Sequence, residues 1–339
     1  MEFSFFFPTN DRGGTHIVGC LMQGLQLLGH KIYSNVPVTE FKSHGIYPPF
    51  SRLMSHDIEI TSDLSRGHLI VDAFNGLGDF EQSLKKSARN NKIVLLDMSD
   101  GCNLRDYDDN FLVFITHFNK LALRSGKILP IGFGLSEEAA QATGQYIYCE
   151  RKKDILRNFR PSNNQSVRNS LDLGLLPLLR NHFMITESFS NTDQYIRDLL
   201  THKAVLAYGG DLYKDLRQNE YFSNFKDLVF KVIASEPVVL RFDSWRFYEA
   251  ALFGACPISL DFDRYGLETS ANPIPWKEYI PIDFSQIEAT TSRIAEEVDM
   301  DPFFLEKIGL NARAWVINKH SPKATARRFL ESMAQYQFL

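Results

Sequence analysis

The chain has 339 residues, of which 44% are hydrophobic and 23% charged, a composition typical of a folded globular protein rather than a disordered one. A chain of this length favours two domains. The formal net charge of −4 excludes a global positive field of the kind that holds nucleic acid or an anionic membrane, so we expect no nucleic-acid partner.

Residues 1–35 predict a βαβ unit, the building block of a parallel α/β sheet. An apolar strand over 3–7 leads into a loop of turn-forming residues over 8–14. Apolar residues then recur at the spacing of one helical face, namely Val18, Leu21, Met22, Leu25 and Leu28. Gly29 is placed to end that helix, and a second strand begins at Lys31.

Further apolar runs predict strands over 68–72, 92–97, 111–116 and 128–134. Near-continuous apolar runs of this length are typical of strands buried on both faces. The first two end in Asp72 and Asp97, and acidic side chains at the carboxyl ends of parallel strands lie where ligands bind. We therefore expect a first Rossmann-like domain over residues 1–145.

A second α/β series occupies the rest of the chain. We expect strands over 155–159, 183–186, 204–208, 238–240 and 257–260, and helices over 165–179, 195–200 and 245–253. Ser321 and Pro322 predict the start of a final helix, as N-cap and first helical residue. The fold class is thus α/β, with two Rossmann-like doubly wound domains facing a cleft and the second domain over 150–318.

The segment from Arg241 to Glu249 carries the clearest chemistry. Asp243 or Ser244 can cap a short helix, whose free N–H groups and dipole form an anion site. Arg246 can clamp a diphosphate, and Glu249, three residues on, can accept both hydroxyls of a ribose. The alternative is an ordinary ion pair within the helix, worth a few tenths of a kcal/mol.

The pattern Ser244-x-Arg246-x-x-Glu249-Ala250, followed by Gly-Ala-Cys-Pro-Ile over 254–258, resembles the donor-site signature of GT-B glycosyltransferases. It is most similar to that of the exostosin-type and spore-coat-type branches. The resemblance implies that Glu249 holds the donor ribose while Ser244 and Arg246 meet the diphosphate. It also implies that the helix over 319–339 packs back on the first domain.

Other residues join the predicted site less specifically. On the donor side we include Tyr208, Gly209 and Gly210 after a predicted strand, which could pack the base or touch phosphate, and Arg241, Asp243 and Trp245 beside the signature. Trp245 could equally belong to the core, and a simple turn is an alternative for the glycines.

The first loop holds Gly13 and Gly14, which allow a ligand to approach the backbone. His16, Asp11 and Asp100 are the candidates for the base that deprotonates the acceptor if the enzyme inverts. A helix-start role for His16, a cap for Asp11 and an Asp-Gly turn for Asp100 remain open.

These residues predict transfer of a sugar from a nucleoside diphosphate sugar to an acceptor hydroxyl. We find no His-x-x-x-His or Walker motif and assign none of the Asp-x-Asp triplets to a metal, so we expect no metal and no cofactor beyond the nucleotide-sugar co-substrate. Many retaining relatives carry a second glutamate eight positions before the first, where this chain has Arg241, so the stereochemistry stays open. The alternatives are a nucleotide-sugar epimerase or phosphorylase on the same fold, and a non-catalytic sugar- or nucleotide-binding subunit.

The four cysteines are scattered without a Cys-x-x-Cys pair, which predicts reduced thiols. The N-terminus lacks a basic region, and its apolar run stops at Pro8, so we expect no signal peptide. No run approaches the ~20 apolar residues of a membrane span. We expect a cytoplasmic protein, in which the short basic run over 151–153 is solvated surface.

Overall fold

The computed structural model describes residues 1–8, 15–37, 58–63, 65–74, 77, 80–88, 92–99, 107, 110–121, 127–143, 150–160, 166–188, 192–213 and 238–339. Four predicted site residues, Asp11, Gly13, Gly14 and Asp100, lie outside the described residues. The chain divides into two compact units. The first comprises Met1–Phe118, Leu123–Ala139 and Lys319–Leu339, and the second comprises Asn119–Ala122 and Ala140–Asn318.

The first unit contains, within the described residues, a seven-stranded parallel sheet in the order β3-β2-β1-β4-β5-β6-β8. Its strands are β1 (Glu2–Phe6), β2 (Lys31–Ser34), β3 (Ile58–Ile60), β4 (His68–Asp72), β5 (Ile93–Asp97), β6 (Phe111–Ile115) and β8 (Ile128–Pro130). All five residues of β5 are buried, as expected of a central strand covered on both faces. β3 is an edge strand that the sequence analysis did not predict.

The order of these strands reverses between β1 and β4. Helix α1 (Thr15–Leu27) connects β1 to β2 in one direction, and α2 (Phe80–Ala88) connects β4 to β5 in the other. Because such crossovers are right-handed, helices that run in opposite directions cover opposite faces of the sheet. The reversal is a topological switch point, the place where open α/β sheets bind ligands.

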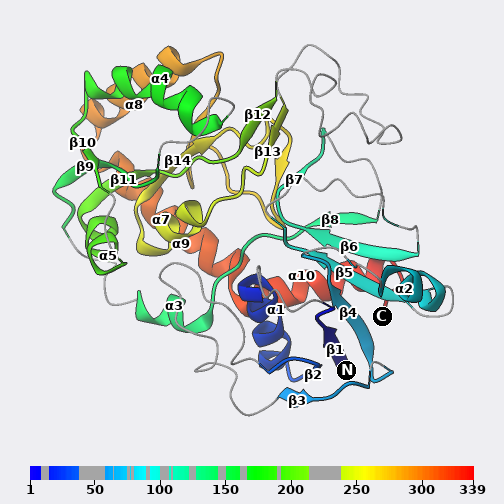
Figure 1. The fold of residues 1–339 in the computed structure, drawn as a ribbon. Coiled ribbons are helices and arrows are strands. Elements are labelled where there is room, and N and C mark those ends of the chain that lie inside the picture. The colour runs from blue at the N-terminus through cyan, green and yellow to red at the C-terminus, as the bar shows by residue number, and fades with distance from the viewer. Residues whose placement is uncertain are drawn as a thin grey trace. The chain divides into compact units, whose positions relative to one another are not determined.

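Helix α10 (Pro322–Gln335) packs against α1 within this unit (Figure 1). It starts with Pro322 at the first helical position, as the sequence predicts, although the Ser321 side chain makes no cap hydrogen bond. The two helices approach closely at Gly24. A Cβ atom there would lie 2.0 Å from the carbonyl oxygen of Pro322 and 2.9 Å from the Cβ atom of Ala326.

The second unit is built on a five-stranded parallel sheet in the order β10-β9-β11-β14-β16, counted among the described residues. Its strands are β9 (Lys153–Arg157), β10 (Ile185–Glu187), β11 (His202–Leu206), β14 (Cys256–Leu260) and β16 (Ile280–Ile282). The helices that flank it are α4 (Val167–Arg180), α5 (Thr192–Thr201), α7 (Trp245–Phe253) and α8 (Ile287–Met300). The switch point of this sheet lies between β9 and β11. α4 packs with α8, and α5 with α7 (Figure 1).

Some elements differ from the sequence-based expectation. Strand β13 (Val238–Leu240) has the predicted bounds, but it pairs antiparallel with β12 (Asp211–Tyr213) in a two-stranded sheet of its own. α9 (Phe304–His320), α8 and β16 were not predicted at all, and neither were α2 and α3 (Glu137–Ala142). None of the helices in the described part of the chain is long and apolar enough to cross a membrane.

Arg151 corrects the expectation of a solvated basic run. Its guanidinium donates hydrogen bonds to the carbonyl oxygens of Leu199 (2.6 Å), His202 (2.5 Å) and Phe253 (2.5 Å). Carbonyl groups at the ends of helices lack partners within the helix, so a partly buried cation beside them is stabilising. Arg151 therefore joins the carboxyl ends of α5 and α7.

We predict that Gly24→Ala lowers the free energy of unfolding by about 1–3 kcal/mol, because the added methyl group overlaps a backbone carbonyl that cannot move without shifting α10. Urea denaturation measures the change. Gly174→Ala is the matched control: it also lies inside a helix, but its Cβ atom would meet only the terminal methyl of Ile287, at 3.2 Å. Alanine has a higher helix propensity than glycine, so we expect Gly174→Ala to leave the free energy of unfolding unchanged or to raise it. Equal losses in both variants would contradict close packing at Gly24.

Candidate nucleotide-sugar site

Helix α7 begins and ends where local sequence rules place it. Ser244 is the N-cap, in an extended conformation, and its hydroxyl accepts from the backbone N–H of Arg246 at 3.3 Å. Gly254 ends the helix with a φ of 74°, a left-handed conformation that glycine adopts without strain. Of the two caps left open by the sequence, Ser244 is therefore the one used. The side chain of Asp243 instead accepts from the backbone N–H of Ser244 at 3.1 Å.

Glu249 and Arg246 form the predicted pair on the first turns of this helix. The distance between Arg246 Nη1 and Glu249 Oε2 is 2.5 Å. Glu249 is fully buried, whereas the side chain of Arg246 keeps 30% of its exposure. Burial alone lowers the pKa of a guanidinium, but the attraction of Glu249 and the contacts with Tyr195 together outweigh it and raise the pKa of Arg246. The pair is much less solvated than an ordinary surface pair.

The two oxygens of Glu249 differ in their hydrogen bonds. The hydroxyl of Tyr195, on α5, donates to Oε2 at 2.7 Å, so both donors bind the same oxygen. Oε1 is buried and receives no hydrogen bond from the described residues. A buried acceptor left unsatisfied costs about 1–3 kcal/mol. A hydroxyl group that reached this oxygen would remove that cost.

The pair lies at the switch point of the second unit. Arg246 Nε donates to the carbonyl oxygen of Asn158, the residue directly after β9, at 3.1 Å. Gly209 follows β11, the neighbouring strand, and its α-carbon faces Ser244 and Arg168. A Cβ atom at Gly209 would come no closer than 3.6 Å to any of its neighbours. A glycine with room for a methyl group, beside a helix N-terminus, allows a ligand to approach the backbone.

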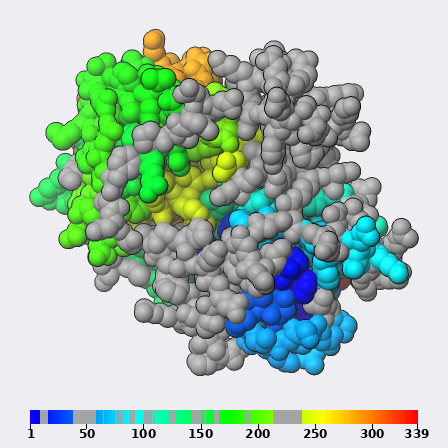
Figure 2. Space-filling model, viewed as in Figure 1, coloured from blue at the N-terminus to red at the C-terminus, as the bar shows by residue number. Residues whose placement is uncertain are grey.

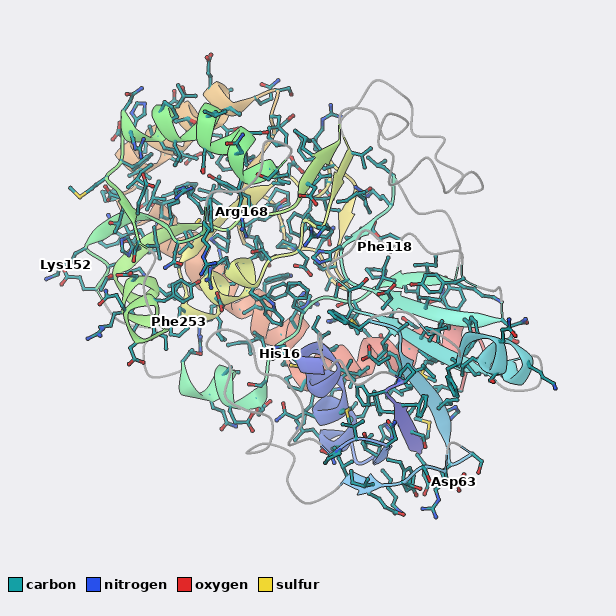
Figure 3. All side chains as sticks on the ribbon, viewed as in Figure 1. His16, Asp63, Phe118, Lys152, Arg168 and Phe253 are labelled. Atoms are coloured by element: carbon teal, nitrogen blue, oxygen red, sulfur yellow. The ribbon has the colours of Figure 1, made fainter. Side chains whose placement is uncertain are left out.

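Arg168 is a second cation at this place, which the sequence analysis missed. It lies on the first turn of α4 (labelled in Figure 3), and its Nε donates to the carbonyl oxygen of Tyr208 at 3.5 Å. Burial, followed by the repulsion of Arg246, lowers the pKa of Arg168. It forms no ion pair with a described carboxylate. Two arginines close enough to repel one another favour an anionic ligand.

The sequence carried a signal for Arg168. Ser166 caps α4, accepting from the backbone N–H of Asn169 at 3.0 Å, and the backbone N–H of Val167 donates to the carbonyl oxygen of Gly210. A serine followed two residues later by an arginine is the same pattern as Ser244 and Arg246. Two capped helices, α4 and α7, thus begin close to the Gly-Gly turn. Yellow and green atoms, from the parts of the chain that hold these helices, reach the visible surface of the unit (Figure 2).

Three further donor-side residues, Tyr208, Trp245 and Gly210, differ in burial and in what they contact. Tyr208 is fully buried, with its hydroxyl donating to Asp172 at 3.0 Å and its ring against Phe159. Trp245 is half-buried. Gly210 is needed by the fold itself, because its φ is 103° and a Cβ atom would lie 2.5 Å from the carbonyl oxygen of Leu240.

Arg241, the residue at the position of the missing glutamate, is exposed. Its backbone has a φ of 53°, which is uncommon outside glycine, and its guanidinium pairs with Asp211 at 3.4 Å. An exposed pair of this kind contributes at most about 1 kcal/mol. Arg241 directly follows β13, and in the described part of the chain it forms no hydrogen bond with Glu249 or Arg246.

Among the base candidates, only His16 lies in the described part of the chain. It is at the start of α1 (labelled in Figure 3), is 1% exposed, and has its Nε2 3.9 Å from the thiol of Cys20. Asp97, at the end of β5, accepts hydrogen bonds from Tyr107 and from the backbone of Ser99.

His117 at the end of β6 is a further feature of the first unit. Its φ is 57°, a left-handed conformation for a residue with a side chain. Such strain costs of order 1–3 kcal/mol and is found mostly at functional sites. No sequence pattern indicated this conformation, since the backbone after a strand depends on what the chain packs against. No group of three or more His, Cys, Asp or Glu residues suited to a metal ion occurs among the described residues.

Neither a protein-family model nor a curated protein sequence matches this chain. Solved structures do. The chain is similar to AviGT4, a glycosyltransferase involved in avilamycin A biosynthesis, with 11% identity over 99% of this chain and 98% of the other and a TM-score of 0.50.

It is also similar to an alpha-glucosyltransferase in two complexes. With UDP and a 13-mer DNA containing an A:G mismatch, the identity is 10% over 99% of this chain and 100% of the other, and the TM-score is 0.56. With UDP-glucose and DNA containing an abasic site, the identity is 10% over 99% of each chain, and the TM-score is 0.54. These likenesses confirm the predicted fold class: the chain is an α/β protein with two Rossmann-like units, the fold of GT-B glycosyltransferases.

We predict that Arg246→Met lowers the free energy of unfolding by about 2–3 kcal/mol, because it leaves the buried charge of Glu249 with the Tyr195 hydroxyl alone. Urea denaturation at neutral pH measures the loss. Adding Glu249→Gln to this variant recovers part of it, since no charge then remains buried. Arg264→Met is the control: Arg264 is 42% exposed and lies 3.7 Å from Asp283, so its loss costs at most ~1 kcal/mol. Similar losses for both arginines would show that Glu249 does not depend on Arg246.

Proposed function

We propose that this protein is a glycosyltransferase that moves a sugar from a nucleoside diphosphate sugar to an acceptor hydroxyl, without a metal ion. The observation that carries the proposal is the convergence at one switch point of two arginines and a buried carboxylate with an unpartnered oxygen. A nucleoside diphosphate offers the complementary groups, two anionic phosphates and a ribose with two hydroxyl donors. The similar solved structures, which are named as glycosyltransferases, support the same function.

Each group has a role in this proposal. Glu249 Oε1 accepts a ribose hydroxyl once the side chains that enclose it yield, while Arg246 and Arg168 neutralise the diphosphate. The positive end of the α7 dipole adds to this field. Gly209 leaves room for the phosphates beside Ser244. As the sugar leaves, negative charge develops on the diphosphate, and fixed cations of this kind lower the energy of that state.

The finer likeness to exostosin-type and spore-coat-type enzymes rests on the signature over 244–258 alone and is part of the proposal. Arg241 occupies the position of the first glutamate of many retaining enzymes. Its guanidinium forms an ion pair with Asp211. We therefore propose no stereochemical course.

The acceptor side belongs to the first unit. Here the proposal keeps His16, Asp11 and Asp100 as candidates for the base, with Gly13 and Gly14 as the place where the backbone approaches the ligand. To these we add His117, on the strength of its backbone strain. Both structures of the alpha-glucosyltransferase hold DNA, but the net charge of −4 supplies no general attraction for a phosphate backbone, so we propose a carbohydrate or other non-nucleic-acid acceptor.

Sugar transfer is preferred to the epimerase and phosphorylase alternatives because the similar structures are named as glycosyltransferases. A non-catalytic subunit that binds nucleotide sugars would share the donor site. Release of free nucleoside diphosphate in the presence of an acceptor distinguishes a glycosyltransferase from a binding subunit, since a binding subunit releases none.

We predict that a nucleoside diphosphate raises the melting temperature of the wild-type protein by several degrees. A ligand at ~100 times its Kd stabilises the folded state by about 2.7 kcal/mol. A thermal-shift screen with ADP, GDP, CDP, UDP and their glucose or mannose conjugates, where these exist, measures it. Glu249→Ala should abolish the shift. No stabilisation of the wild type by any of these nucleotides would overturn the proposal.

Arg168 and Arg180 provide a matched pair in the same screen. Both lie on α4, but Arg180 is 52% exposed and pairs with Glu187, away from Arg246. Arg168→Ala should weaken diphosphate binding about tenfold and monophosphate binding less, since it removes a contact with the phosphates. Arg180→Ala should leave both unchanged. An equal loss of affinity for the monophosphate and the diphosphate would contradict the contact between Arg168 and the diphosphate.

We predict opposite effects for the two neighbouring glycines after β11. Gly209→Ala should fold with an unchanged melting temperature, because its Cβ atom has only ordinary contacts, but should lose the nucleotide-induced shift. Gly210→Ala should lower the melting temperature itself, because of its φ of 103° and the nearby carbonyl of Leu240. Full nucleotide binding by Gly209→Ala would show that the phosphates do not lie against this turn.

A further inference from the structure

Tyr195 connects helix α5 to the Arg246–Glu249 pair in two ways. Its hydroxyl donates to Glu249 Oε2 at 2.7 Å, and the guanidinium carbon of Arg246 lies 4.2 Å from the centre of its ring. The residue is 4% exposed. A tyrosine that touches both members of an ion pair supports the anion by a hydrogen bond and the cation through its ring face.

The hydrogen bonds to Glu249 are one-sided. Arg246 and Tyr195 both bind Oε2, whereas Oε1 is buried without a partner. Two donors on one oxygen fix the rotation of the carboxylate about its last bond, because turning it would break both. The second oxygen is thereby held in a defined direction before any ligand arrives. A fixed carboxylate reduces the ordering cost of binding once the side chains that enclose Oε1 have moved.

The tyrosine remains a donor throughout the neutral range. Burial, followed by the charge of Glu249, raises the pKa of Tyr195 well above its ordinary value. Its proton therefore stays in place, and the carboxylate receives a neutral hydrogen bond that pH does not switch.

We propose that Tyr195 is a positioning residue that directs Glu249 Oε1 toward a ribose hydroxyl and so sets a preference for ribonucleotides over deoxyribonucleotides. The inference rests on the proposed function, because it needs a nucleotide at this site. Tyr195 does not itself touch the ligand. It acts by keeping the carboxylate in one orientation.

Loss of the hydroxyl frees the carboxylate. Without Tyr195 as a donor, Glu249 can rotate so that both of its oxygens face the guanidinium of Arg246, the bidentate arrangement that arginine favours. Oε1 is then satisfied inside the protein and no longer gains from a ribose hydroxyl. The ring must remain for this comparison, because it also supports Arg246. Tyr195→Phe is therefore the informative substitution.

The test compares a ribonucleotide with its 2′-deoxy analogue in the full chain. The probe is whichever of ADP, GDP, CDP and UDP stabilises the wild type most, and calorimetric titration gives the Kd of that diphosphate and of its 2′-deoxy form. We expect the wild type to prefer the ribonucleotide by about tenfold or more, the loss of one good hydrogen bond to a charged group. In Tyr195→Phe that ratio should fall to about two, mostly through weaker binding of the ribonucleotide.

Tyr265→Phe is the matched control. Tyr265 lies in the same unit, is buried, and donates its hydroxyl to another carboxylate, that of Asp283, at 2.9 Å. This substitution should leave the ratio of the two Kd values as in the wild type, whatever it does to the melting temperature. The ratio, unlike the melting temperature, is not changed by a loss of stability alone.

Three results would count against the inference. A wild type that binds both forms equally, or a Tyr195→Phe variant that keeps the full ratio, would overturn the role of Tyr195 while leaving nucleotide binding intact. A Tyr195→Phe variant whose affinities for the ribonucleotide and its 2′-deoxy form both fall by the same factor would show that Tyr195 has only a structural role. Binding of no nucleotide at all by the wild type would instead overturn the proposed function.

Discussion

The buried charge of Glu249 constrains the structure around it more than any other single group. A carboxylate without exposed surface is stable only where nearby donors and an opposite charge compensate for the water it has lost. Arg246 supplies the charge and Tyr195 a hydrogen bond, and Arg246 is held in turn by the carbonyl oxygen of Asn158. These partners come from α7, α5 and the end of β9. Compensation of one charge therefore ties together the two helices and the strand edge at which a ligand would bind.

The compensation is incomplete. Among the described residues no group donates to Oε1 of Glu249, and burial together with the repulsion of Arg246 lowers the pKa of Arg168. Both features cost stability in the unliganded protein, and a nucleoside diphosphate would relieve both, with its hydroxyls and its phosphates. Residual destabilisation at a binding site is the usual counterpart of function. Arg151 shows the contrast: its guanidinium donates to three carbonyl oxygens, and it serves the packing of α5 and α7.

More of the fold than of the candidate site could be predicted from the sequence. The parallel strands were visible as apolar runs, and α7 has the predicted bounds because its cap, Ser244, and its end, Gly254, are local signals. The pairing of β13 with β12 was not visible, because a three-residue apolar run does not reveal which strand lies next to it. α8 and α9 were missed for a related reason: only one side of each is buried, and their polar residues conceal the apolar pattern.

The sequence alone determined the class of fold and the pair formed by Arg246 and Glu249, since spacing on a helix fixes which side chains are neighbours. It did not determine whether that pair was an ordinary surface contact. Only the tertiary structure decided this. It buries Glu249 completely, brings Tyr195 to Glu249 from 54 residues earlier in the chain, and brings Arg168 near Arg246 from 78 residues earlier. Burial and the approach of distant groups depend on packing between elements, and the electrostatic strength of an ion pair depends on both.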